Sequence, residues 1–128
     1  MKLEHVAINV DAPKEMAAWW AEHMGLKVVL DLPDPPMMTF VSDSGGSMVE
    51  LYNNTNAPIP DYNTIDPFTL HFAFTTEDIA ADRDRLIAAG ATADGEIAPP
   101  SPRGDVLCFV RDPWGVTIQL IQRSQPLE

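Results

Sequence analysis

The chain has 128 residues, 45% of them hydrophobic, which is typical of one globular domain with a packed core. It carries 19 carboxylates against 8 lysines and arginines, and this net charge of −11 argues against nucleic acid and anionic membranes as partners. The single cysteine excludes an intramolecular disulfide and a thiolate metal cluster. Charged residues interrupt the first positions, so we read no export signal there and expect a cytoplasmic protein.

The first part of the chain predicts a strand, a helix and three further strands. Leu3 to Val10 alternates apolar and polar residues, the pattern of a half-buried strand. Residues 14–24 carry methionine and tryptophan at four-residue spacing, which predicts an amphipathic helix that ends at Gly25. The three further strands are expected over residues 26–32, 37–43 and 47–53.

The second part of the chain predicts the same order of elements. Residues 54–67 are rich in Asn, Pro, Asp and Thr without sustained periodicity, so they are interpreted as a linker. A strand is expected over 68–75 and a helix from Thr76 to Ala89, stopped by Gly90. The last three strands are expected over residues 91–97, 105–111 and 116–122.

An internal repeat links the two parts. Residues 39–53 align with residues 108–122 at an offset of 69, and each copy is a strand, a tight Asp-to-Gly turn and a second strand. In this alignment Glu50 stands opposite Gln119. The repeat predicts an α+β fold of two tandem β-α-β-β-β modules within one domain, 1–128. Module one covers about 1–53, the linker 54–67, and module two about 68–123.

Four polar residues are expected on one face of the predicted sheet, opposite the helices. Strand alternation places there the two histidines that repeat at an offset of 66 and the two aligned hairpin residues, namely His5, Glu50, His71 and Gln119. A single strand histidine is more often structural than a ligand. A charged Glu50 among apolar neighbours needs a partner, however, and a metal cation supplies one.

Five segments carry a resemblance to a known family: LEHVAINV, MAAWWAEHMGLKVV, MVELYN, FTLHFAF and FVRDPWGVTIQLIQ. With them the whole chain resembles the vicinal oxygen chelate superfamily, which includes glyoxalase I, methylmalonyl-CoA epimerase, fosfomycin-resistance enzymes, extradiol dioxygenases and bleomycin-resistance proteins. The resemblance implies paired modules whose curved, cup-like sheet surrounds one divalent metal ion, such as Ni, Zn, Mn or Fe. The ligands would come from the first and last strands of each module, here His5, Glu50, His71 and Gln119.

The His/Glu/His part of this set is similar to a glyoxalase-like site. It implies a lyase or isomerase that moves a proton alpha to a metal-bound carbonyl of a small-molecule substrate. Gln119 stands where glyoxalase-type lyases usually have a carboxylate, and an amide cannot usefully accept a proton near neutral pH. Glu50 is therefore the candidate base among the four residues.

Two other functions stay open. One is a metal-free module that sequesters a ligand, as in the bleomycin-resistance branch, where the acidic charge would suit a cationic ligand. The other is an Fe(II) extradiol-type dioxygenase, since two histidines and one carboxylate can hold Fe(II) with open positions.

The surroundings of the predicted site give weaker indications. Arg103, on a proline-rich loop, is a candidate clamp for a substrate carboxylate. Tyr52 and Met48 would line the cup beside Glu50. Short chains that resemble this one are usually homodimers, and in some of these relatives two subunits share each metal site.

Overall fold

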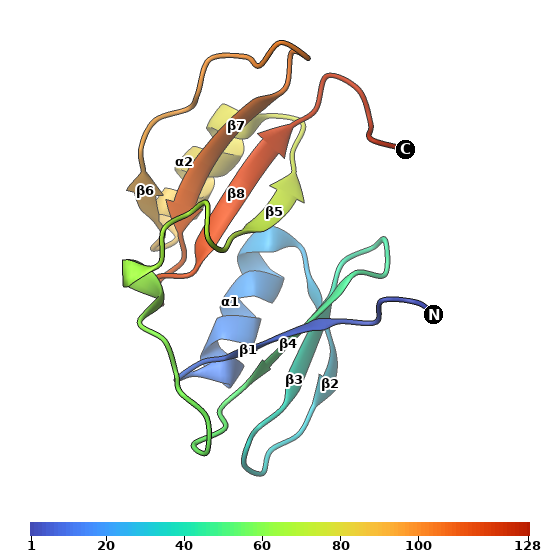
Figure 1. Ribbon diagram of the computed structural model, residues 1–128, viewed down its shortest axis with the longest axis vertical. Helices are drawn as coiled ribbons and strands as arrows, with labels where there is room; N and C mark the ends of the chain where they lie inside the picture. The colour runs from blue at the N-terminus through green and yellow to red at the C-terminus, as the bar shows by residue number, and fades with distance from the viewer. The chain divides into compact units, whose positions relative to one another are not determined.

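The computed structural model describes all 128 residues. The chain divides into two compact units, unit 1 (Met1–Pro60) and unit 2 (Asp61–Glu128), and the boundary lies within the predicted linker. Each unit has one long helix beside a four-stranded sheet, as Figure 1 shows. None of the helices has the length and apolar character needed to cross a membrane. The assignment of residues 1–128 to one domain stays a prediction.

The two units repeat one topology. The elements of unit 1 are β1 (Val6–Asn9), α1 (Pro13–Met24), β2 (Lys27–Asp31), β3 (Thr39–Ser42) and β4 (Met48–Tyr52). Those of unit 2 are the 3₁₀ helix η1 (Tyr62–Thr64), β5 (Phe72–Thr75), α2 (Ile79–Ala88), β6 (Thr92–Asp94), β7 (Val106–Arg111) and β8 (Thr117–Gln122). The sheets have the orders β1-β4-β3-β2 and β5-β8-β7-β6. The predicted α+β fold of two β-α-β-β-β modules is therefore confirmed.

Each helix buries one face against its own sheet. In unit 1 the fully buried side chains of Met16 and Trp20 on α1 belong to the same core as Leu51 of β4. In unit 2 Leu86 of α2 and Ile118 of β8 are equally buried. This packing leaves the opposite sheet face for the polar residues that alternate with the core positions along each strand.

The predicted strand over 68–75 is wrong for its first residues, because β5 begins only at Phe72. The Asp66 side chain accepts a hydrogen bond from the Phe68 N–H at 2.8 Å, and the Asp66 carbonyl accepts one from the Thr69 N–H at 2.9 Å. These local bonds close a turn and compete with strand pairing. His71 consequently lies in the short segment between this turn and β5.

The linker residues of unit 2 are held by Arg111 at the end of β7. Its guanidinium donates to the carbonyls of Tyr62 at 2.9 Å and Ile65 at 3.0 Å, and to the carboxylate of Asp94 at 2.9 Å. A fourth hydrogen bond reaches the Gly115 carbonyl at 3.1 Å. One side chain thus fastens η1 to the β7–β8 turn and to β6, which fixes the chain that leads to His71.

Candidate functional site

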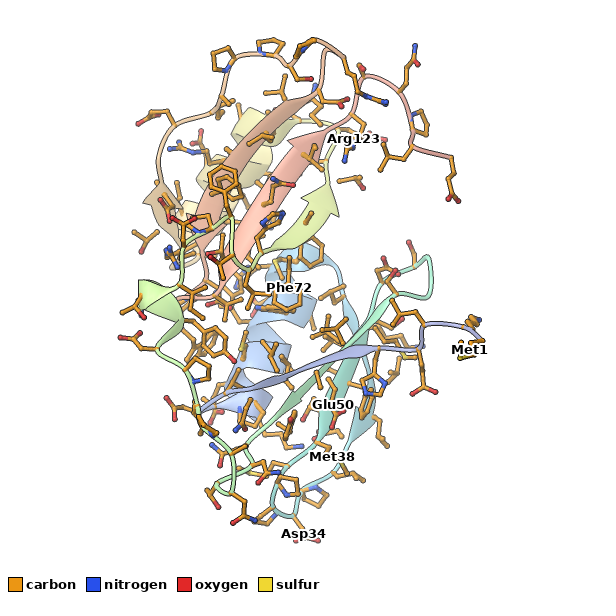
Figure 2. The ribbon with its side chains drawn as sticks, in the orientation of Figure 1. Met1, Asp34, Met38, Glu50, Phe72 and Arg123 are labelled. Carbon is orange, nitrogen blue, oxygen red and sulfur yellow. The ribbon has the colours of Figure 1, made fainter.

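In unit 1 the strand register brings His5 and Glu50 together. Parallel pairing of β1 with β4 sets Ala7 opposite Glu50, and His5 lies two residues before Ala7, on the same face. His5 Nε2 lies 3.1 Å from Glu50 Oε2, with side-chain exposures of 30% and 13%. Glu50 projects from the middle of β4 in Figure 2. A nitrogen and an oxygen donor therefore lie within contact distance on the face opposite α1.

Unit 2 repeats the same register, with the amide of Gln119 where unit 1 has the carboxylate of Glu50. Pairing of β5 with β8 sets Ala73 opposite Gln119, and His71 again lies two residues before that alanine. His71 and Gln119, both half-buried, thus share one face of their sheet. The repeat seen in the sequence is a repeat of strand pairing, position by position.

Two phenylalanines support the two imidazole rings. The ring centroids of His5 and Phe40 are 5.0 Å apart, and those of His71 and Phe109 are 5.5 Å apart, both edge-on. Phe40 is the Cα partner of Glu50, and Phe109 is the Cα partner of Gln119. Sequence reasoning aligned these phenylalanines without giving them a role, although their place opposite Glu50 and Gln119 in each hairpin was the available signal.

The Nδ1 atom of each histidine contacts an oxygen atom, but the two acceptors are unrelated. His5 Nδ1 lies 2.9 Å from Glu4 Oε1, and His71 Nδ1 lies 2.7 Å from the Pro67 carbonyl oxygen. A carbonyl can only accept, so the Nδ1–H of His71 is the donor and the neutral ring keeps its lone pair on Nε2. Sequence reasoning missed both acceptors, since no pattern distinguishes Glu4 or Pro67 from other surface residues.

The predicted substrate residues lie in different settings. Met48 and Tyr52 lie two residues before and after Glu50 on β4, so their side chains share its sheet face. Both are half-buried. Arg103 is 57% exposed and its Nε lies 3.2 Å from Asp105 Oδ2. Asp105, only 5% exposed, also contacts Arg123 Nη1 at 3.0 Å. Two guanidinium groups therefore share one carboxylate near the beginning of β7.

Residues 2–120 match the family model described as the Glyoxalase/Bleomycin resistance protein/Dioxygenase superfamily. The chain belongs to this superfamily. The resemblance inferred from the five sequence segments is thereby confirmed, and solved structures of glyoxalase-family proteins share the fold.

Curated relatives in the superfamily are named as lyases. The chain is 30% identical to the lactoylglutathione lyase of Arabidopsis thaliana over 126 residues, which cover 94% of this chain and 44% of that protein. It is 27% identical over 130 residues to the "Probable lactoylglutathione lyase" of Vibrio parahaemolyticus, covering 97% of this chain and 92% of that protein. The chain thus spans less than half the length of the plant relative and nearly all of the bacterial one.

Solved structures of the superfamily show the same fold. A glyoxalase-family protein from Bacillus cereus superposes with a TM-score of 0.80 at 22% identity, covering 96% of this chain and 94% of that one. The antibiotic-binding protein TnmS3 from a Streptomyces species superposes with a TM-score of 0.67 at 23% identity, covering 97% and 99%. At these identities the likeness concerns the fold alone.

The donor atoms of the superfamily site fit a divalent transition metal in type. Imidazole nitrogen and carboxylate or amide oxygen are ligands that Zn, Ni, Mn and Fe accept. His5 Nε2 and Glu50 Oε2 are already adjacent, and the Nδ1 contact of His71 leaves Nε2 for coordination. Each unit supplies two of the four predicted ligands, and no group of three or more His, Cys, Asp or Glu side chains is gathered to hold a metal.

Proposed function

We propose that this chain is a divalent-metal-dependent enzyme of glyoxalase type. It would act as a lyase or isomerase that moves a proton alpha to a metal-bound carbonyl of a small-molecule substrate. The observation that carries the proposal is the contact of His5 Nε2 with Glu50 Oε2 at 3.1 Å, on a sheet face whose register is repeated by His71 and Gln119. Membership of the superfamily and the lyase names of its relatives support it.

The metal would be held by His5, Glu50, His71 and Gln119, with Ni, Zn, Mn or Fe as candidates. When bound, it supplies Lewis acidity that polarises the substrate carbonyl. Metal-ligating histidines almost always donate their second ring N–H to an oxygen acceptor, which orients the ring. Both His5 and His71 make such a contact through Nδ1, to two unrelated acceptors, and we propose that Nε2 is the nitrogen that each would give to the metal.

Glu50 is the proposed general base. Its carboxylate is 13% exposed and lies on the face that carries the proposed metal ligands, whereas Gln119 has no oxygen that takes up a proton near neutral pH. A carboxylate oxygen of Glu50 would remove the proton, so that the substrate C–H bond breaks and its electron pair stays on the substrate. The same oxygen would then return the proton to the adjacent carbonyl carbon, while the hydroxyl proton of the first carbon passes to the former carbonyl oxygen, so that the carbonyl and hydroxyl groups exchange places. The isomerisation balances without any oxidant or reductant.

Three further residues are proposed to contact the substrate. Met48 and Tyr52 flank Glu50 on its own strand and face. Arg103 would bind a substrate carboxylate, because a guanidinium and a carboxylate form paired charge-assisted hydrogen bonds. Its present partner Asp105 also contacts Arg123, so Arg103 can turn toward a substrate without leaving a buried carboxylate unpaired.

We also propose that the chain forms a homodimer, which light scattering after size-exclusion chromatography would test.

The first experiment measures metal content. Protein purified without an affinity tag is expected to hold about one transition metal per chain, lost in His5→Ala and Glu50→Ala without loss of circular dichroism. Glu50→Gln is the sharper variant, because an amide oxygen still ligates but cannot accept the proton: metal is retained and turnover is lost. Activity is assayed first as hemithioacetal isomerisation, then as epimerisation, then as oxygen-dependent ring cleavage.

The repeat offers a matched control for the base. The double variant Glu50→Gln, Gln119→Glu keeps the donor types and the net charge but moves the carboxylate to the equivalent position of unit 2. It should bind metal as wild type does and regain part of the turnover that Glu50→Gln loses. A wild-type protein that stays empty after incubation with Ni²⁺, Zn²⁺, Mn²⁺ and Fe²⁺ would overturn the proposed metal chemistry.

That outcome would favour the second candidate, a metal-free protein that sequesters a ligand. One observation supports it: Leu30 pairs with Phe40, the partner of Glu50, and is 45% exposed. An apolar side chain so placed offers contact area to a ligand on that face, and the net charge of −11 favours a cationic one. Ligand screening would then replace kinetics.

A further inference from the structure

The carboxylate of Glu4 lies against the histidine of unit 1. Glu4 Oε1 is 2.9 Å from His5 Nδ1, while His5 Nε2 on the other side of the ring is 3.1 Å from Glu50 Oε2. The imidazole is therefore held between two carboxylates, one contacting each nitrogen. Glu50 lies on the face that carries the proposed metal ligands, whereas Glu4 precedes the strand and is 71% exposed.

The equivalent contact in unit 2 is made differently. The offset of 66 residues that relates His5 to His71 relates Glu4 to Leu70, which has no oxygen in its side chain. There the turn that begins at Asp66 brings the Pro67 carbonyl to 2.7 Å from His71 Nδ1. The sequence repeat therefore does not account for the presence of a carboxylate at position 4. The Glu4 carboxylate takes the place of the backbone acceptor that contacts the histidine in unit 2.

We propose that Glu4 is a positioning residue for His5. The Glu4 carboxylate accepts a hydrogen bond from the Nδ1–H of His5 and so presents Nε2 beside Glu50 as the metal-binding nitrogen. This inference rests on the proposed function. An acceptor on the far nitrogen fixes both the tautomer and the orientation of the ring, and a charged acceptor makes the near nitrogen a stronger donor to a metal. The orientation of the His5 ring should consequently depend on a side chain, which a substitution can remove. The orientation of the His71 ring depends on a main-chain carbonyl, which a substitution leaves in place.

The expected loss of metal affinity on removing Glu4 follows from the solvent exposure of its side chain. Partners of metal ligands change metal affinity by 10- to 100-fold when they are removed. Glu4 is largely exposed, and water screens an exposed ion pair, so we expect the lower end, about tenfold weaker binding in Glu4→Ala. Glu4→Gln keeps an accepting oxygen but loses the charge, so its affinity should lie between those of wild type and Glu4→Ala.

The test measures Zn²⁺ and Mn²⁺ dissociation constants by competition with a chelator for wild type, Glu4→Ala and Glu4→Gln. Glu15→Gln on α1 is the matched control, because it removes an exposed carboxylate of the same unit that lies outside the site. In the Zn²⁺-loaded protein, nitrogen NMR of the imidazoles should show His5 with its proton on Nδ1 and the metal on Nε2. The Nδ1 proton of His5 should exchange faster with water in Glu4→Ala, while His71 keeps its wild-type signals.

The outcomes separate this inference from the proposed function. If wild type binds neither metal, the proposed function fails and the role of Glu4 fails with it. If wild type binds, Glu50→Ala does not, and both Glu4 variants bind as tightly as wild type with unchanged His5 signals, only the role of Glu4 is overturned. Equal weakening in Glu4→Gln, Glu4→Ala and Glu15→Gln would also overturn it, since net charge alone would then explain the loss.

Discussion

The imidazole of His5 lies edge-on against the ring of Phe40, with the centroids 5.0 Å apart and the ring planes at 77°. His71 and Phe109 repeat the arrangement at 5.5 Å and 64°. In each unit the phenylalanine is also the cross-strand partner of the second predicted ligand. Phe40 pairs with Glu50, and Phe109 pairs with Gln119. In each unit two strands and the residue just before a third thus hold the two predicted ligands and their phenylalanine, and the aromatic ring limits how far the imidazole can turn.

Replacing Phe40 with leucine should therefore weaken metal binding as well as the fold. Edge-on aromatic pairs contribute about 0.5–1.5 kcal/mol beyond their buried area, so the free energy of unfolding should fall by about 1 kcal/mol. Metal affinity should fall severalfold, because the ring of His5 would sample orientations that point Nε2 away from Glu50. Isothermal titration with Zn²⁺ and denaturant unfolding measure the two effects.

Phe68→Leu is the control for that substitution. Phe68 is 84% exposed, and the ring it meets is that of Phe109, at 5.5 Å, rather than an imidazole. It should leave metal affinity unchanged. If Phe40→Leu loses stability but binds Zn²⁺ as tightly as wild type does, Phe40 serves packing alone.

The two hairpin turns offer a matched pair of glycines for a stability test. Gly46 and Gly115 have nearly the same left-handed backbone, with φ of 90° and 89°, a conformation unfavourable for residues with a Cβ. A Cβ at Gly46 meets open space, whereas one at Gly115 overlaps the side-chain amide of Asn63 in η1. Gly46→Ala should lower the free energy of unfolding by about 1 kcal/mol, the cost of the backbone alone.

Gly115→Ala should cost more, about 2 kcal/mol or above, because Asn63 must move as well. Urea unfolding of both variants, with wild type and the double variant Gly115→Ala, Asn63→Ala, gives the comparison. The double variant should recover the excess over Gly46→Ala. Equal costs for the two single variants would show that Asn63 moves aside freely.

Asp105 should make the protein less stable in acid. The backbone N–H of Ser124, then the side chain of Arg123 and the charges of Arg103 and Arg123, hold the pKa of the Asp105 carboxyl below its ordinary value of 3.8. Because the unfolded chain then binds the proton more readily, this contribution is present above pH 3.8 and is lost as the pH falls through the lower folded-state pKa.

Asp105→Asn removes the titrating group, so the variant should be less stable than wild type at pH 7 but lose less stability between pH 5 and 2. Urea midpoints across that range, with the exposed Asp84→Asn on α2 as control, measure the difference. Parallel pH profiles for wild type and Asp105→Asn would contradict the assignment of acid sensitivity to this carboxyl.

Much of the fold followed from short-range patterns in the sequence. The four-residue spacing before Gly25 located α1, and the aligned segments that contain Phe40 and Phe109 identified the repeated hairpins. The start of β5 could not be read in this way, because alternation continues through Phe68 to Leu70 while Asp66 closes a turn there. The 3₁₀ helix η1 was also missed, since it depends on Asp61 as its cap and on Arg111 of β7.

For the candidate site, the sequence by itself predicted that His5 shares a sheet face with Glu50, and His71 with Gln119, because side chains alternate along a strand whatever its partners are. The tertiary structure decided which of them meet. The contact of His5 with Glu50 depends on the pairing of β1 with β4, strands about 40 residues apart, whose register no local pattern encodes. It also decided which oxygen lies against Nδ1 of each imidazole, a side-chain carboxylate in unit 1 and a turn carbonyl in unit 2.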